Sequence, residues 1–265
     1  LATLTSTTTD LLTLKVTGTT ATAIELNTID AATSVKVNAS AIKDISGDAA
    51  DLKTMYASKT ISGLGNEAVT ITDTQSATNV NIILGATSGN VTAIVTADTA
   101  AALNTALTNA TTGTDVLTLT VNGATAQATD LIGLDNKTSV DVSVTATAVS
   151  GTFANLNTVY VTNVANYVNL GDENVTITDT TSASNVNIIL GATSGNVTAT
   201  VSADTAANLN SALTNATSTD ALTLTITDTS LSSLTNLLAL DTKTSVAVNA
   251  ASITSITEIY ANLNT

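Results

Sequence analysis

Hydrophobic and polar residues alternate in short segments that recur along the whole chain. In one of these segments Val69 and Ile71 alternate with Thr70 and Thr72. Alternation with a period of two is typical of a β-strand that has one buried and one exposed face. The sequence therefore predicts a series of strands, which begin near Leu11, Val35, Val69, Val91, Val116, Val140, Val175, Val197, Ala221 and Val246.

Between the predicted strands the hydrophobic spacing changes from two to four. Leu103 and Leu107 lie four apart in an Ala-rich run that follows Asp98, and a matching run follows Asp204. This spacing predicts short helices, with the two Asp residues as N-caps. Similar spacing predicts further short helices over 153–160 and 231–238.

The chain contains long internal repeats. The segment 69–98 returns with few changes as 175–204, an offset of 106 residues, and residues 1–65 match the second half of an earlier copy. We therefore divide the chain into a partial copy (1–65), a full copy (66–171) and a nearly full copy (172–265). We expect these copies to form one continuous array, and the chain to be a fragment of a longer repetitive protein.

Within each copy the strands mostly recur every 22 to 25 residues. One strand and the short helix that follows it, here called a coil, cannot bury its own apolar face, whereas stacked coils can. The pattern predicts an α/β solenoid, a right-handed stack of coils with one parallel sheet. The alternative is an all-β right-handed β-helix, and the leucines spaced four apart favour the version with helices.

Composition limits the chemistry that the chain can perform. It has no His, Cys, Trp or Pro, five aromatic residues in all and a formal charge of -14. Without His or Cys there is no imidazole base, no thiol nucleophile and no zinc site of the usual type. We predict that the protein is not an enzyme, has no cofactor and does not bind nucleic acid, because its charge has the wrong sign for a polyanion. No apolar run is long enough to predict a transmembrane segment.

Calcium is the one ion that the acidic residues suggest. Asp172 and Glu173 are adjacent in a predicted loop, and Asp30, Asp135 and Asp241 each precede a predicted strand. Calcium requires six to eight oxygen ligands, and no segment offers three closely spaced carboxylates. The other interpretation is that these residues cap helices or turns.

Threonines form the outward positions of the predicted strands. An array of paired Thr side chains would suit an ice-binding surface, although Ile94, Lys15, Lys36, Asp141 and Asn249 interrupt it. The alternative is that Thr, a β-branched residue, simply solvates an exposed sheet. The predicted face consists of Thr70, Thr72, Thr92, Thr96, Thr118, Thr120, Thr176, Thr178, Thr198, Thr200, Thr223 and Thr225.

The tyrosines are Tyr56, Tyr160, Tyr167 and Tyr260. All four fall in the longest coil of a copy, so two roles are open for them. They could contact a neighbouring molecule laterally, or they could fill a wider core in that coil.

The phrases VTITDT, GLGNEAVT, LNTIDAATSVKVNAS and SGTFANLNTVY resemble those of long Thr/Ala/Asp-rich tandem-repeat surface proteins of bacteria, notably cyanobacteria. Such proteins are associated with adhesion, surface layers and extracellular fibres. The resemblance implies an extracellular or cell-surface location and no catalytic residues. Some of these proteins carry glycine-rich calcium-binding nonapeptides, a motif that this sequence lacks.

We therefore predict a non-enzymatic structural repeat protein that self-assembles into an extracellular filament, surface layer or stalk. One alternative is an adhesin stalk whose binding domain, for a surface or a glycan, lies outside this sequence. Another is an ice-binding solenoid that uses the outward threonines.

Overall fold

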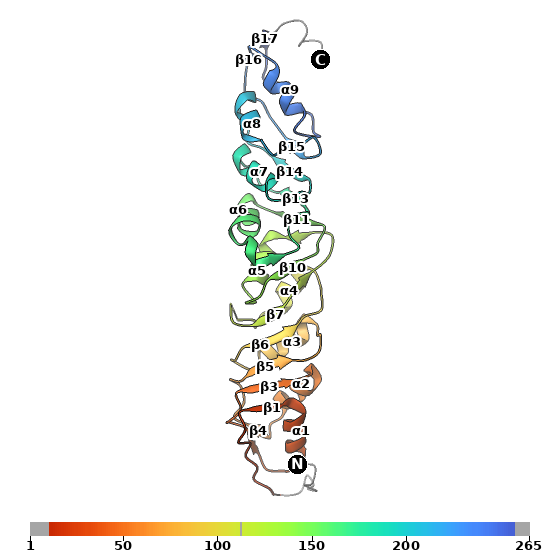
Figure 1. The fold of residues 1–265 in the computed structure, drawn as a ribbon, viewed down its shortest axis with the longest axis vertical. Helices are drawn as coiled ribbons and strands as arrows, with labels where there is room; N and C mark the ends of the chain where they lie inside the picture. Colours follow the sequence, from red (N-terminus) through yellow and green to blue (C-terminus); the bar gives the residue numbers. More distant parts are fainter. Residues whose placement is uncertain (1–10, 112, 258–265) are drawn as a thin grey trace. The chain divides into compact units, whose positions relative to one another are not determined.

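The computed structural model describes residues 11–111 and 113–257 as a mixed α/β protein with parallel sheets (Figure 1). Contacts divide the described chain into two compact units. The first runs to Val121 and includes Gly133–Val142, and the second holds Asn122–Ile132 and continues from Ser143. The copies predicted at 1–65, 66–171 and 172–265 are a different division, based on sequence similarity alone.

The first unit contains a five-stranded parallel sheet. Its strand order is β1-β3-β5-β6-β7, so every neighbouring pair follows the order of the chain. Ile45 pairs with Val69, and Val69 pairs with Val91. The strands are β1 (Thr20–Thr22), β3 (Asp44–Gly47), β5 (Ala68–Ile71), β6 (Val91–Ile94) and β7 (Val116–Thr118), with a second small sheet of β2 (Val37–Asn38) and β4 (Ile61–Ser62), and β8 (Thr120–Val121) at the end of the unit.

Short helices separate these strands. They are α1 (Ala23–Ala31), α2 (Ala49–Ala57), α3 (Ala77–Leu84) and α4 (Ala100–Ala106), and α1 to α3 lie beside β1, β3 and β5 in Figure 1. The helix α5 (Ala128–Asp135) and the strand β10 (Val142–Val144) each contain residues of both units.

The second unit repeats this pattern. Its five-stranded parallel sheet has the order β15-β14-β13-β11-β9, again with neighbours in chain order. The strands are β9 (Ala126–Gln127), β11 (Ala148–Gly151), β13 (Asn174–Ile177), β14 (Val197–Thr200) and β15 (Ala221–Thr223), together with β12 (Tyr167–Val168) and the pair β16 (Ser230–Leu231) and β17 (Ser255–Ile256). The helices are α6 (Phe153–Asn157), the π-helix η1 (Thr158–Thr162), the 3-10 helix η2 (Val164–Asn166), α7 (Ala183–Leu190), α8 (Ala206–Ala212) and α9 (Thr235–Asp241).

The helices after β6 and β14 begin one residue later than the sequence predicts. The Thr99 hydroxyl accepts a hydrogen bond from the Ala102 amide, and Thr205 does the same for Asn208. Asp98 instead accepts from the amide of Thr99 at 2.7 Å. Thr99 and Thr205 are therefore the N-caps, because their hydroxyls reach the third amide of the helix whereas the Asp carboxylates bind the amide just before it.

A narrow aliphatic core lies between the strands and helices of each unit. Val69 and Val91 from the sheet and Leu103 from α4 are almost completely buried in the first unit, as are Val175 and Val197 in the second. The strand side chains alternate between buried and exposed, as the period of two predicts. The helices that pack on them show that the all-strand alternative is wrong. No helix within the described ranges is both long and apolar enough to span a membrane.

Candidate functional site

The predicted threonine face is exposed on both sheets. Ten of the twelve threonines have exposed side chains, and Thr120 and Thr225 are half-buried. They point away from the core because they alternate with buried aliphatic residues along each strand.

The strand register interrupts this face in the first unit. Thr70 pairs with Thr92, but the next partner of Thr92 is Val116. Two residues further along the same strands, Thr118 pairs with Ile94, which is 54% exposed. The regular array of paired threonines is therefore not continuous.

The second unit has a similar break. Thr176 pairs with Thr198, and Thr198 then pairs with Ala221, although Thr200 does pair with Thr223. The length of the segment between two strands determines which of their residues pair. A Thr in each strand therefore does not guarantee a row of paired Thr side chains across the sheet. The exposed face is rich in Thr without being a regular lattice of it.

Buried aspartates that sequence reasoning missed connect successive coils. Asp115 Oδ1 accepts a hydrogen bond from the Val91 amide of the preceding strand at 2.7 Å, and its Oδ2 accepts from the Thr111 amide at 2.7 Å. Asp220 makes the equivalent bonds to Val197 and Thr217, both at 2.8 Å. The available signal was an Asp at the start of a strand, in DVLTLTV and DALTLTI, rather than before a helix.

Two buried threonines and two lysines extend these connections. The Thr138 hydroxyl accepts from the Leu117 amide at 3.0 Å and donates to the Leu117 carbonyl at 2.8 Å, and Thr244 bonds Leu222 in the same way. The Lys137 ammonium donates to the Leu107 carbonyl at 2.8 Å, at the end of α4. Lys243 does the same after α8. A cation at a helix C-terminus stabilises the helix dipole.

Two of the tyrosines, Tyr56 and Tyr160, bind buried glutamates through their hydroxyls. Tyr160 and Tyr167 are only 4% and 6% exposed, so they are not available for the lateral contacts predicted for them and instead fill the core. Tyr56 is half-buried, and its hydroxyl donates to Glu67 Oε1. Tyr260 lies outside the described residues. Burial, the hydrogen bond to Glu67 and the negative charge of Glu67 raise the pKa of Tyr56.

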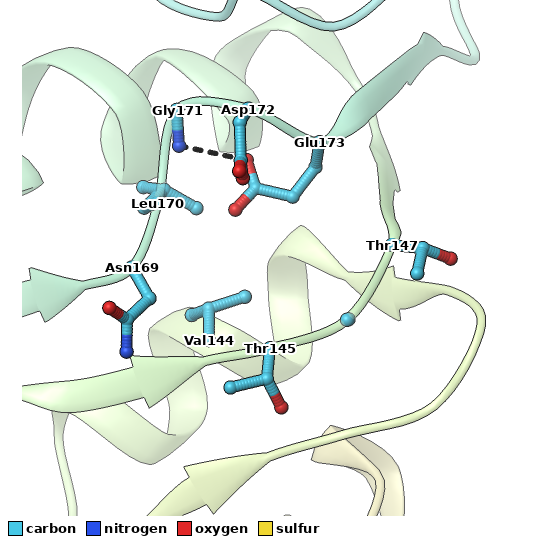
Figure 2. A pocket seen from close by; sticks show the side chains of 9 residues that line it. Val144, Thr145, Thr147, Asn169, Leu170, Gly171, Asp172 and Glu173 are labelled. Carbon is cyan, nitrogen blue, oxygen red and sulfur yellow. Dashed lines mark hydrogen bonds between the residues drawn. The ribbon is translucent and has the colours of Figure 1, made fainter.

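Glu173, the glutamate that binds Tyr160, lines a hollow of about 620 Å³ in the second unit (Figure 2). Glu173 Oε2 accepts from the Gly171 amide at 2.9 Å and from the Tyr160 hydroxyl at 3.1 Å. Its Oε1 is buried and has no hydrogen-bond partner. The hollow is lined by Val144, Thr145, Ala146, Thr147, Asn169, Leu170, Gly171, Asp172 and Glu173.

The other acidic candidates are not brought together. Asp30 lies near the end of α1, and Asp135 and Asp241 are the last residues of α5 and α9. Asp30 Oδ2 accepts from the Ser58 hydroxyl at 2.8 Å. In the part of the chain that the structure describes, no three acidic residues converge as a potential metal site.

Comparison with known proteins leaves the function to be argued from this geometry. No protein-family model, no curated protein and no solved structure matches the chain.

Proposed function

We propose that the chain forms a right-handed α/β solenoid, and that it serves as a non-enzymatic structural repeat protein at the cell surface or outside the cell. One observation carries this proposal. In each compact unit the strands pair in parallel and in chain order, with 22 to 26 residues between paired positions. Such pairing is what a solenoid requires, because each coil contacts only its neighbours.

The contacts between coils support a mechanical role. Asp115 and Asp220 each use both carboxylate oxygens, one within their own coil and one on the preceding strand. Hydrogen bonds to a charged acceptor are about twice as strong as neutral ones. Together with the sheet hydrogen bonds and the buried aliphatic side chains, they would resist bending and separation of neighbouring coils.

The exposed surface of both sheets is suited to contact with water. Threonine hydroxyls cover much of both sheets, and the formal charge of -14 keeps copies from associating through their sides without specificity. The resemblance to tandem-repeat surface proteins favours export. The proposal includes self-assembly into a filament, layer or stalk, because any uncapped end of a solenoid exposes strand edges and apolar core. The interrupted threonine files do not favour ice binding.

A repeat insertion tests the solenoid. A second copy of residues 66–171 is inserted after residue 171, which adds four coils that start at β5, β6, β7 and β11. At about 4.8 Å per strand the particle should lengthen by roughly 19 Å with an unchanged cross-section. Small-angle scattering measures both quantities. The control is the same 106 residues attached to the C-terminus through a flexible Gly-Ser linker.

A compact extra body instead of a longer particle would contradict the solenoid. Self-assembly is tested separately, by electron microscopy of the purified chain over a range of concentrations. Thin uniform fibres or sheets support it, and isolated particles at every concentration count against it.

A further inference from the structure

The buried Glu173 carboxylate is incompletely satisfied. The residue is only 3% exposed, yet its Oε1 has no hydrogen-bond partner. In Figure 2 this oxygen faces the hollow, above Val144 and beside Leu170. A buried carboxylate oxygen without a partner is costly, and nearly all such oxygens in proteins are satisfied by protein, water or an ion.

An equivalent glutamate, Glu67, lies 106 residues earlier in the chain, and both of its carboxylate oxygens are hydrogen-bonded. We call the surroundings of Glu67 the first copy and those of Glu173 the second copy of this site. At the offset of 106 residues, Glu67 corresponds to Glu173. Glu67 Oε1 accepts from the Tyr56 hydroxyl, and its Oε2 accepts from the amides of Gly65 and Asn66 at 2.7 and 3.0 Å. The free oxygen is therefore a property of the second copy and not of the repeat.

The two copies also differ in charge around this glutamate. Asp172 stands where the first copy has Asn66. Thr147 stands where the first copy has Lys43, since the Thr147 carbonyl accepts from the first amide of β13 and the Lys43 carbonyl accepts from the first amide of β5. At the next position Ala148 stands where the first copy has Asp44, so the loss of the lysine is balanced by the loss of an aspartate. The net charge difference at these positions is the added carboxylate of Asp172.

Asp172 and Glu173 are adjacent in the chain, and both line the hollow. A cation in the hollow can therefore contact the carboxylates of both residues.

We propose that the hollow is a calcium site, in which Glu173 Oε1 and the Asp172 carboxylate are the protein ligands and water completes the coordination. Calcium accepts irregular shells of six to eight oxygens, whereas magnesium needs a near-ideal octahedron. With two carboxylates the site belongs to the weak class, with a Kd on the order of 10⁻⁴ to 10⁻³ M, which suits extracellular calcium. This inference is independent of the proposed scaffold role.

Terbium luminescence tests the site directly, because Tb³⁺ replaces Ca²⁺ and emits when a nearby tyrosine is excited. Tyr160 donates to Glu173 at 3.1 Å, and the chain has no Trp to compete as a sensitiser. We expect saturable tyrosine-sensitised emission that millimolar Ca²⁺ displaces and Mg²⁺ displaces less well. Asp172→Asn should weaken Tb³⁺ and Ca²⁺ binding by at least about tenfold, since it removes a ligand. Because Asp172 is exposed, this variant should keep the fold.

The first copy supplies the matched control. Asn66→Asp places a second carboxylate beside Glu67, whose oxygens are already hydrogen-bonded, so it should create no comparable site. Calorimetric titration of the wild-type chain and Asp172→Asn with Ca²⁺ gives a readout that does not depend on tyrosine. Absence of sensitised emission overturns the proposal. So do equal affinities in the wild-type chain and Asp172→Asn, which would mean adventitious binding to an acidic surface.

Discussion

Asp220→Asn is the sharpest test of how neighbouring coils hold together. Asp220 is only 3% exposed, and each of its carboxylate oxygens accepts hydrogen bonds from a different part of the chain. Oδ1 accepts from the Val197 amide at 2.8 Å, and Oδ2 accepts from the amide and hydroxyl of Thr217 at 2.8 and 3.0 Å. Asparagine has nearly the same shape, so the substitution leaves packing intact and changes only the hydrogen bonding.

The expected loss follows from those contacts. The asparagine oxygen can serve one side only, and its amide group then faces an N–H donor on the other side. One hydrogen bond to a charged acceptor, worth about 1.5 to 3 kcal/mol, is lost and one buried donor is left without an acceptor, at a cost of about 1 to 3 kcal/mol. We expect the free energy of unfolding of the second unit to fall by about 3 kcal/mol, which corresponds to roughly 100-fold faster amide exchange in β14 if exchange requires that unit to open.

The measurement is urea unfolding followed by circular dichroism, together with hydrogen exchange of the segment around Val197. The control is Asp241→Asn, which removes the same charge from an exposed residue and should change stability by less than about 0.5 kcal/mol. A change in Asp220→Asn no larger than in this control would refute the view that the buried aspartates hold the coils together.

Two further predictions concern the tyrosines and a close backbone contact. Burial raises the pKa of Tyr56 and Tyr160 above the ordinary value near 10, so their contribution to stability is complete below pH 10 and is lost as the pH rises further. Absorbance at 295 nm should show these two tyrosines ionising only together with loss of circular dichroism, and ionisation of every tyrosine near pH 10 in a folded chain would contradict this. A Cβ at position 195 would overlap the main chain of Glu173, so Gly195→Ala should lower stability by about 1 to 3 kcal/mol in a thermal melt. Gly18→Ala, which meets no atom closer than 3.5 Å, should melt like the wild-type chain, and equal effects of the two substitutions would show that the close contact is unimportant.

Local patterning predicted part of the secondary structure, including β5, β6, α4 and α8, but it missed β1, β3 and β11. The strands predicted near Leu11 and Val246 form only isolated bridges, at Lys15 and Asn249. Val69 and Ile71 alternate with Thr70 and Thr72, and all four take the burial that a half-buried strand requires. Leucines spaced four apart likewise mark α4 and α8, because residues at that spacing share one face of a helix. These features depend only on neighbouring residues, so one sequence with internal repeats was sufficient to find them.

Only the tertiary structure decided which residues of different coils meet. Thr92 lies beside Val116 because the lengths of the intervening loops set the register, and no local pattern encodes that length difference. Asp115 looks like any surface aspartate until the amide of Val91 is placed against it. Glu67 and Glu173 have similar surroundings in the sequence, yet one is fully hydrogen-bonded and the other is not. The alternation determines which side of a strand is buried, whereas the neighbouring coil determines what each buried polar group can bond to.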